Sequence, residues 1–321
     1  MVDLGKLKSL GAWPRLRREI ESAVLDILGD MPKERADLQV KVLNEVVFPG
    51  YVRRRVNYFV DDWTRISAWL FLPEAKEDVP GILCCHSTVP QGKDSPAGIE
   101  GEPRLALARH YAEQGYATIA PDCITAGERA GIGLEPYDTT HFYKDYPKMS
   151  AMGKMLWDHI HALDALCDTR GVDSARLGVV GHSLGGHNAL MLAALDERIQ
   201  ACVASGAFTR FADDKSPERW ARDQGFIYLP KLAPAIKKRK YPFDWEHVLA
   251  LAAPSPILLI TSLNDDVFPN TKSCEKARKL ALNVYKLLGE PDALVNHTHQ
   301  EGHSMTAEAI EAADEWFERW L

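Results

Sequence analysis

A G-H-S-L-G pentad at 181–185 constrains the fold of this chain more than any other segment. It follows an apolar run at 177–180 and precedes a helix-forming run at 188–194, and this order is typical of a nucleophile elbow. So tight a turn leaves no room for side chains two residues before and two residues after the serine, which fits the glycines at both ends of the pentad. The pattern predicts that Ser183 is a nucleophile presented above the edge of a sheet.

The segments around Ser183 also predict where an oxyanion would bind. A helix that starts at the serine directs free backbone N–H groups and its positive dipole end toward the reacting carbonyl. Leu184, the next residue, is therefore expected to supply one donor. The second donor is expected from the loop 86–93, with Thr88 as the first candidate and Ser87 as the second. The alternative interpretation is a Gly-Ser turn without chemistry.

A serine hydroxyl is a weak nucleophile, so it needs a base and a third group that orients the base. After such an elbow the chain order is serine, acid, histidine. His303, directly before the last expected helix, is predicted to be the base, with His299 as the second candidate. The acid is expected after the strand at 257–261, where Asp265 and Asp266 are adjacent. Neighbouring side chains diverge, so only one of the two can face the imidazole.

The spacing of apolar residues predicts an α/β fold with a mainly parallel sheet. Residues 39–43, 52–60 and 66–72 are expected to form antiparallel strands near the N-terminus. From Gly81 onward, short buried runs alternate with helical segments, as in βαβ units. The later strands are expected at 82–85, 117–120, 177–180, 201–204, 257–261 and 293–295, and the helices at 104–113, 150–167, 273–288 and 305–320.

We expect one domain spanning residues 1–321, with a helical extension at 1–37 and a cap insertion at 208–247. The cap is long, mixed and aromatic, and it is predicted to lie over the carboxyl ends of the strands. Its rings either wall the substrate pocket or form a satellite cluster that closes the domain. The five candidate substrate-binding rings are Trp220, Phe226, Tyr228, Phe243 and Trp245.

Charge and cysteine content argue against several classes of partner. The net charge of −7 leaves no basic footprint, and the basic run at 237–240 is expected to be a solvated surface, so no nucleic-acid partner is predicted. The long, nearly uncharged stretch at 248–264 contains Pro254 and Pro256, which indicate a helix end and a buried strand and not a membrane span. The six cysteines lack C-x-x-C spacing, which favours reduced thiols and a cytoplasmic location.

An alternative interpretation of His297, His299 and His303 is a metal site, because zinc sites use closely spaced histidines. Metal binding there would leave the Ser183 elbow without a base. We therefore expect no metal and no cofactor.

With these residues assigned, residues 38–321 resemble the α/β-hydrolase superfamily, and more narrowly its dienelactone-hydrolase-like and acetyl-xylan-esterase-like branch. The segments that carry the resemblance are 86–88, 92–93, 120–122, 127–129, 153–154, 157–158, 181–188, 241–245, 265–269 and 302–303. The resemblance implies that Asp265, four residues before Pro269, is the acid and that Asp266 is not. Dienelactone hydrolases proper carry a cysteine where this chain has Ser183.

The resemblance implies a serine carboxylesterase that acts on small acyl esters, including acetylated sugars, through Ser183, His303 and Asp265. A prolyl peptidase would usually carry a large propeller, for which the chain has no room. The rival hypothesis is a non-catalytic α/β-hydrolase module that binds a ligand or partner through the cap. The oligomeric state and the roles of Lys93, Arg129 and Lys154 are left open.

Overall fold

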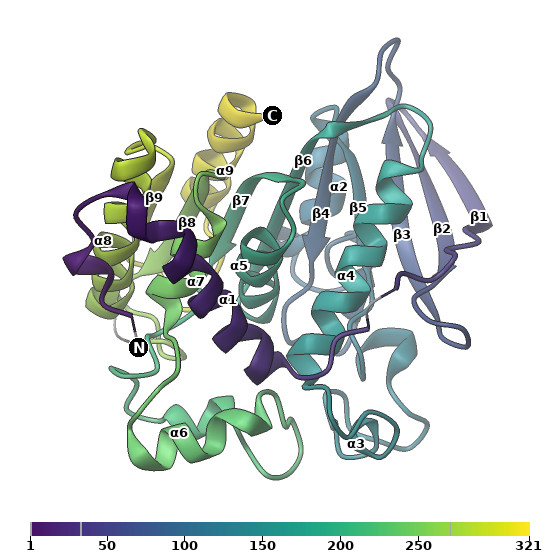
Figure 1. The fold of residues 1–321 in the computed structure, drawn as a ribbon. Helices are drawn as coiled ribbons and strands as arrows, with labels where there is room; N and C mark the ends of the chain where they lie inside the picture. Colours follow the sequence, from purple (N-terminus) through teal and green to yellow (C-terminus); the bar gives the residue numbers. More distant parts are fainter. Residues whose placement is uncertain (1, 33, 270) are drawn as a thin grey trace.

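The computed structural model describes residues 2–32, 34–269 and 271–321. Within these residues nine strands form a single sheet in the order β1-β2-β3-β5-β4-β6-β7-β8-β9 (Figure 1). The first three strands are antiparallel to their neighbours, and all pairs from β5 to β9 are parallel. This arrangement confirms the predicted α/β-hydrolase sheet.

Most strands lie close to their predicted positions, but the first begins two residues later than predicted and continues to Phe48, and the strand predicted at 177–180 begins at Val172. The antiparallel part consists of β1 (Lys41–Phe48), β2 (Tyr51–Phe59) and β3 (Arg65–Pro73). The parallel part consists of β4 (Val79–Cys85), β5 (Ala117–Pro121), β6 (Val172–His182), β7 (Ile199–Ser205), β8 (Ile257–Ser262) and β9 (Leu294–His299). Residues of the central strands are buried on both faces, as expected for a sheet that helices cover on both sides.

Helices form a layer on each face of the sheet (Figure 1). One face packs against α2 (Leu107–Glu113) and α9 (Ala307–Trp320). The other packs against α4 (Ala151–Cys167), α5 (Leu184–Leu195), α7 (Trp245–Ala252) and α8 (Thr271–Leu288), with α1 (Trp13–Leu28) outside α7. Strand β4 serves both cores, because Leu83 and Cys85 face one and Ile82 and Cys84 face the other.

Two irregular segments lie together at one end of the molecule, shown at the bottom of Figure 1. One contains α3 (Phe142–Asp145), and the other contains α6 (Ala233–Lys238). They contact each other, since the Thr139 N–H donates to the Gly225 carbonyl at 3.0 Å. The second segment lies within 208–247, the range predicted to form a cap, and α7 begins inside this range because Asp244 caps it in a capping box with His247.

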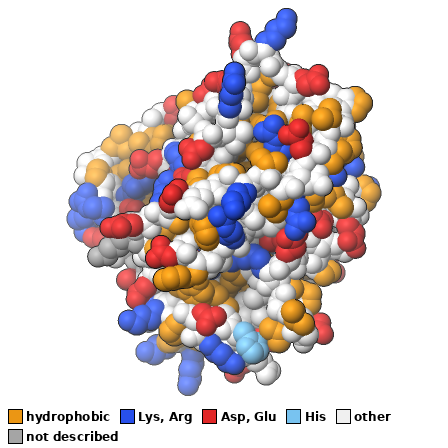
Figure 2. Space-filling view, turned by 90° about the vertical axis from the view of Figure 1, so that its right-hand side faces the viewer, with side chains coloured by type: hydrophobic (Ala, Val, Ile, Leu, Met, Phe, Trp, Pro, Cys, Tyr) orange, Lys and Arg blue, Asp and Glu red, His pale blue; other side chains and the backbone are white. Residues whose placement is uncertain are grey.

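The edge of the sheet at β1 is turned toward the viewer in Figure 2, where hydrophobic and charged side chains are interspersed. The residues of this strand are exposed apart from Phe48, which is half-buried. Among the described residues, no helix combines the length and apolar composition that crossing a membrane requires.

Candidate active site

Ser183 lies at the sharp turn between β6 and α5. Its backbone has φ 56° and ψ −117°, a conformation that side-chain-bearing residues rarely adopt. A Cβ added to Gly181 would lie 2.2 Å from the Gly185 carbonyl carbon, and one added to Gly185 would lie 2.2 Å from the Cys85 carbonyl oxygen. Both glycines are therefore required by close packing, which confirms the predicted reason for their positions.

His303 and Asp265 are joined by a hydrogen bond of 2.9 Å between Nδ1 and Oδ2. The other carboxylate oxygen, Oδ1, accepts from the backbone N–H groups of Val267 and Phe268 at 2.8 and 2.6 Å. Burial disfavours the charge on Asp265, but the His303 hydrogen bond and these N–H donors outweigh it and lower the pKa of this carboxyl. Asp266, the other candidate, is exposed.

The imidazole of His303 lies beside the elbow. The ring lies close to Gly206, since a Cβ on this glycine would be 3.0 Å from His303 Cε1. The preceding residue, Ser205, is bonded to the elbow, because its carbonyl accepts the Ser183 N–H at 2.8 Å. His303 Nε2 is buried and has no hydrogen-bond partner among the described residues. That nitrogen is therefore available for a hydroxyl, and such hydrogen bonds often form fully only when substrate is bound.

His182 is a site residue whose role the sequence analysis missed, although it stands inside the pentad. Its ring lies 4.6 Å from the His303 ring, centroid to centroid, and its Nδ1 is 3.0 Å from Ser205 Oγ. Burial lowers the pKa of His182 to about 3, so the ring is neutral at physiological pH. The neutral His182 ring therefore places no positive charge beside His303.

The loop after β4 approaches the elbow through Ser87. Ser87 Oγ donates to the His182 carbonyl at 2.9 Å, whereas the Thr88 side chain is exposed. Within the described chain, neither Ser87 N–H nor Thr88 N–H donates a backbone hydrogen bond. Both candidates for the second oxyanion donor thus remain open, next to Leu184 at the N-terminus of α5.

A network of ion pairs fixes the loop at 86–93, and Lys93 is the cation of this network. Lys93 Nζ donates to Asp122 Oδ2 at 2.9 Å and to Glu128 Oε1 at 2.6 Å, and its backbone N–H donates to Asp122 Oδ1 at 2.8 Å. Burial works to lower the pKa of Lys93, but the two carboxylates outweigh it and raise the pKa. Tyr137 adds a second tie, since its hydroxyl donates to the Ser87 carbonyl at 2.9 Å.

The five candidate pocket rings are mostly inside the core. Phe226 is half-buried, and the others are buried in the larger core: Trp220, Tyr228, Phe243 and Trp245. Three of the rings surround His187, one helical turn after Ser183, at centroid distances of 4.8 to 5.8 Å. Phe268 connects this cluster to His303, with its ring 5.8 Å from that of His303. Most of the cap rings therefore pack as a core cluster, and a role in binding substrate stays a prediction.

The three closely spaced histidines are not assembled as a metal site. His297 Nε2 lies 3.8 Å from Glu308, while His303 pairs with Asp265. Across the residues that the structure describes, no group of three or more His, Cys, Asp or Glu side chains is placed to hold an ion.

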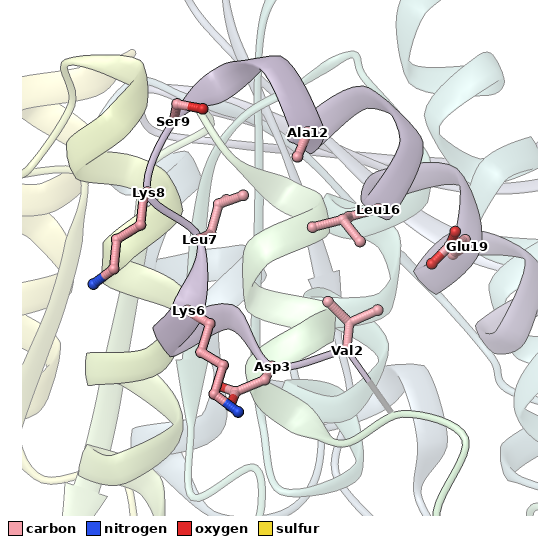
Figure 3. Close-up of a pocket in the computed structure, with 9 residues that line it drawn as sticks. All are labelled: Val2, Asp3, Lys6, Leu7, Lys8, Ser9, Ala12, Leu16 and Glu19. Carbon is pink, nitrogen blue, oxygen red and sulfur yellow. The ribbon is translucent and has the colours of Figure 1, made fainter.

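A cavity of about 550 Å³ lies between the N-terminal segment and α1, away from the triad residues (Figure 3). Leu7 and Leu16 point toward it, and the charged side chains of Asp3, Lys6 and Glu19 surround it. Ser183, His303 and Asp265 do not line this cavity.

Two protein families match the sequence. Residues 141–321, more than half of the chain, match the prolyl oligopeptidase family, and residues 53–212 match the acetyl xylan esterase (AXE1) family. A curated relative, "Putative hydrolase YtaP" of Bacillus subtilis (strain 168), is 25% identical over 316 residues, which cover 95% of this chain and 100% of the relative.

Solved structures of esterases share the fold. A glucuronoyl esterase from Solibacter usitatus has a TM-score of 0.78 at 19% identity, covering 97% of this chain and 94% of its own. An acetyl xylan esterase from Paenibacillus sp. R4 has a TM-score of 0.63 at 18% identity, and the match covers 98% of this chain and 96% of the esterase chain. The chain belongs to the prolyl oligopeptidase family of serine hydrolases, and residues 53–212 are in addition similar to acetyl xylan esterases.

Proposed function

We propose that this enzyme hydrolyses short-chain acyl esters, including acetylated carbohydrates, with Ser183, His303 and Asp265 as a catalytic triad. The observation that carries the proposal is the placement of the Asp265–His303 pair, joined at 2.9 Å, beside a serine held in the strained elbow conformation.

Each residue has a defined role in this mechanism. Ser183 Oγ attacks the ester carbonyl while His303 Nε2 accepts its proton, and Asp265 holds the Nδ1–H tautomer and stabilises the imidazolium. The N–H groups of Leu184 and of Thr88 or Ser87 bind the oxyanion. His303 then protonates the leaving alcohol, and a water molecule activated by His303 releases the acyl group. Apart from the ester and this water molecule, all groups in these steps come from the protein.

The substrate class and the setting are inferences from the relatives and the composition. The names of the matched family and of the structural neighbours specify acetyl xylan and glucuronoyl esters, which supports a carbohydrate ester for this chain. The unpaired thiols support a cytoplasmic location. We also infer a likeness to dienelactone hydrolases. We infer that neither a membrane nor a nucleic acid is a partner of this protein.

Labelling with a fluorophosphonate probe tests the mechanism against the rival hypothesis of a binding module. We expect the wild-type protein to be labelled and to hydrolyse p-nitrophenyl acetate, and the Ser183→Ala variant to do neither. An unlabelled, inactive wild-type protein would favour the non-catalytic module. Because the family includes peptidases, a prolyl-peptide p-nitroanilide should be assayed in parallel, and faster cleavage of that amide than of the ester would replace esterase with peptidase activity.

A further inference from the structure

A second cavity, of about 450 Å³, lies between the β2–β3 turn and the segment that follows β5. Trp63 from the turn and Thr125, Arg129, Tyr146 and Lys154 are among the residues that line it. The segment with α3 contributes to its wall, so the cavity is at the same end of the molecule as the loops at the bottom of Figure 1. No step of the proposed mechanism uses this cavity.

Trp63 lines this cavity, and its side chain is one of the two most exposed large hydrophobic side chains among the described residues. Trp63 is 84% exposed, and Ile132, which lies between the lining residues Gly131 and Leu134, is 106% exposed. Single exposed hydrophobic residues are normal, but a nearly free indole that lines a cavity offers a surface for a ligand. A free indole provides a flat apolar surface with a polar N–H at its edge.

Two of the lining residues, Arg129 and Lys154, are cations that neighbouring carboxylates neutralise. Arg129 Nη1 and Lys154 Nζ donate to the two oxygens of Asp158 at 2.7 and 2.5 Å, and Asp61 lies 3.8 Å from Lys154. Two cations therefore face two carboxylates. Within the described chain, Nε and Nη2 of Arg129 make no hydrogen bond, so they can donate to a ligand. Free donors without net positive charge suit a neutral ligand with hydroxyl groups.

Thr125 gives an independent sign of a ligand. Its φ is +59°, and its Oγ1 is buried without a partner among the described residues. A strained backbone and an unsatisfied buried hydroxyl at a cavity wall are typical of functional sites. The same residue connects the cavity to the active site, because its carbonyl accepts the Tyr137 N–H at 2.8 Å and the Tyr137 hydroxyl donates to the Ser87 carbonyl.

We propose that this cavity is a subsite for a neutral sugar ring in the carbohydrate part of the ester substrate. This inference rests on the proposed ester hydrolysis and extends it to the substrate class. A pyranose ring has an apolar C–H face that stacks on Trp63 and hydroxyl groups that accept from Arg129. Asp138 and Asp145, which also line the cavity, disfavour a uronate or another anion.

Calorimetry with the Ser183→Ala protein tests the subsite without turnover. We expect a neutral xylotetraose to bind, Trp63→Ala in that background to weaken binding by at least about tenfold, and Trp63→Phe to restore most of it. Val47→Ala, a matched change of an exposed apolar residue on β1, should leave binding unchanged. Melting temperatures check that the variants fold.

Turnover by the Ser183-containing enzyme supplies a second measurement. The ratio of kcat/KM for acetylated xylotetraose to kcat/KM for p-nitrophenyl acetate should fall at least about tenfold in Trp63→Ala, mainly through KM. Binding that is unaffected by Trp63→Ala, tighter binding of tetragalacturonate than of xylotetraose, or no binding of either would overturn the subsite. An enzyme that binds xylotetraose through Trp63 but cleaves no ester would overturn the proposed function and leave the subsite standing.

Discussion

The two sides of Ser183 are held by different kinds of electrostatic interaction. On one side, a single hydrogen bond joins His303 to Asp265, and the His303 side chain remains 15% exposed. On the other side, the loop with the oxyanion candidates is tied down by Lys93 and Asp122, whose side chains are 1% and 0% exposed. A group that must exchange protons needs access and a simple partner, whereas a loop that must present backbone N–H groups needs only to be immobile.

This difference predicts that the two sides fail in different ways. Neutralising Asp265 on the His303 side should impair chemistry and cost little stability, because no charge is then left buried without a partner. Removing Lys93 should leave Asp122 buried without a counter-charge and impair the fold itself.

The largest effect is expected at the nucleophile. Ser183→Ala should lower kcat for p-nitrophenyl acetate by at least about 10³-fold, with the melting temperature maintained, because the hydroxyl contributes little packing. EDTA should not change the wild-type rate. Activity within tenfold of wild type in this variant would disprove the mechanism, and zinc-restored activity after chelation would revive a metal site.

Asp265→Asn should lower kcat by about 10²- to 10⁴-fold, because an amide neither stabilises the imidazolium nor fixes its tautomer. Asp266→Asn is the matched control, since that side chain is exposed next to Asp265 and should change kcat little. Steady-state kinetics of both variants make the comparison, and the reverse ranking would show that the acid is misassigned.

Lys93→Met should lower the free energy of unfolding by about 3–5 kcal/mol, because it breaks a buried ion pair and removes one partner only. Lys276→Met is the control: this lysine pairs with Asp213 at 3.4 Å but is 56% exposed, so about 1 kcal/mol or less should be lost. Urea denaturation measures both variants. Equal losses would show that the Lys93–Asp122 pair stabilises the fold no more than an exposed ion pair does.

The dependence of kcat/KM on acyl-chain length tests whether the aromatic rings of the cap limit the space for the acyl group next to Ser183. We expect kcat/KM for p-nitrophenyl esters to peak at roughly two to four carbons and to fall at least about tenfold by about eight carbons, because rigid rings exclude longer chains. Phe226, the half-buried ring, is the first candidate for the wall. A maximum at about eight carbons or beyond would indicate an open trough.

The smallest effect concerns stability in acid. Because the pKa of Asp265 is lowered in the folded state, its contribution to stability is present above the unfolded pKa of about 3.9 and is lost as the pH falls through the folded value. Wild type should exceed Asp265→Asn in unfolding free energy by about 1 kcal/mol at pH 7. Thermal denaturation should show this difference shrinking below about pH 4, and a difference that grows there would contradict the assignment.

The elbow was predictable because a short-range steric rule demands glycine at both ends of the pentad, and the structure meets that rule. The strands were predictable because central parallel strands are continuous apolar runs. The role of Lys93 was not predictable, because its partner Asp122 is 29 residues away in the sequence and no local pattern pairs the two residues. The packing of Trp220 and Trp245 around His187 also depends on tertiary contacts that aromatic composition does not specify. The triad roles remain predictions that the mutants will test.

The backbone angles of Ser183 have a consequence for natural variation at this position. Glycine adopts a positive φ without steric penalty, so Ser183→Gly would relax the turn while removing the hydroxyl. Folding and catalysis thus favour different amino acids at residue 183. A lineage released from the need to cleave esters would be expected to drift toward glycine there and gain stability, so the identity of this residue records whether activity is still under selection.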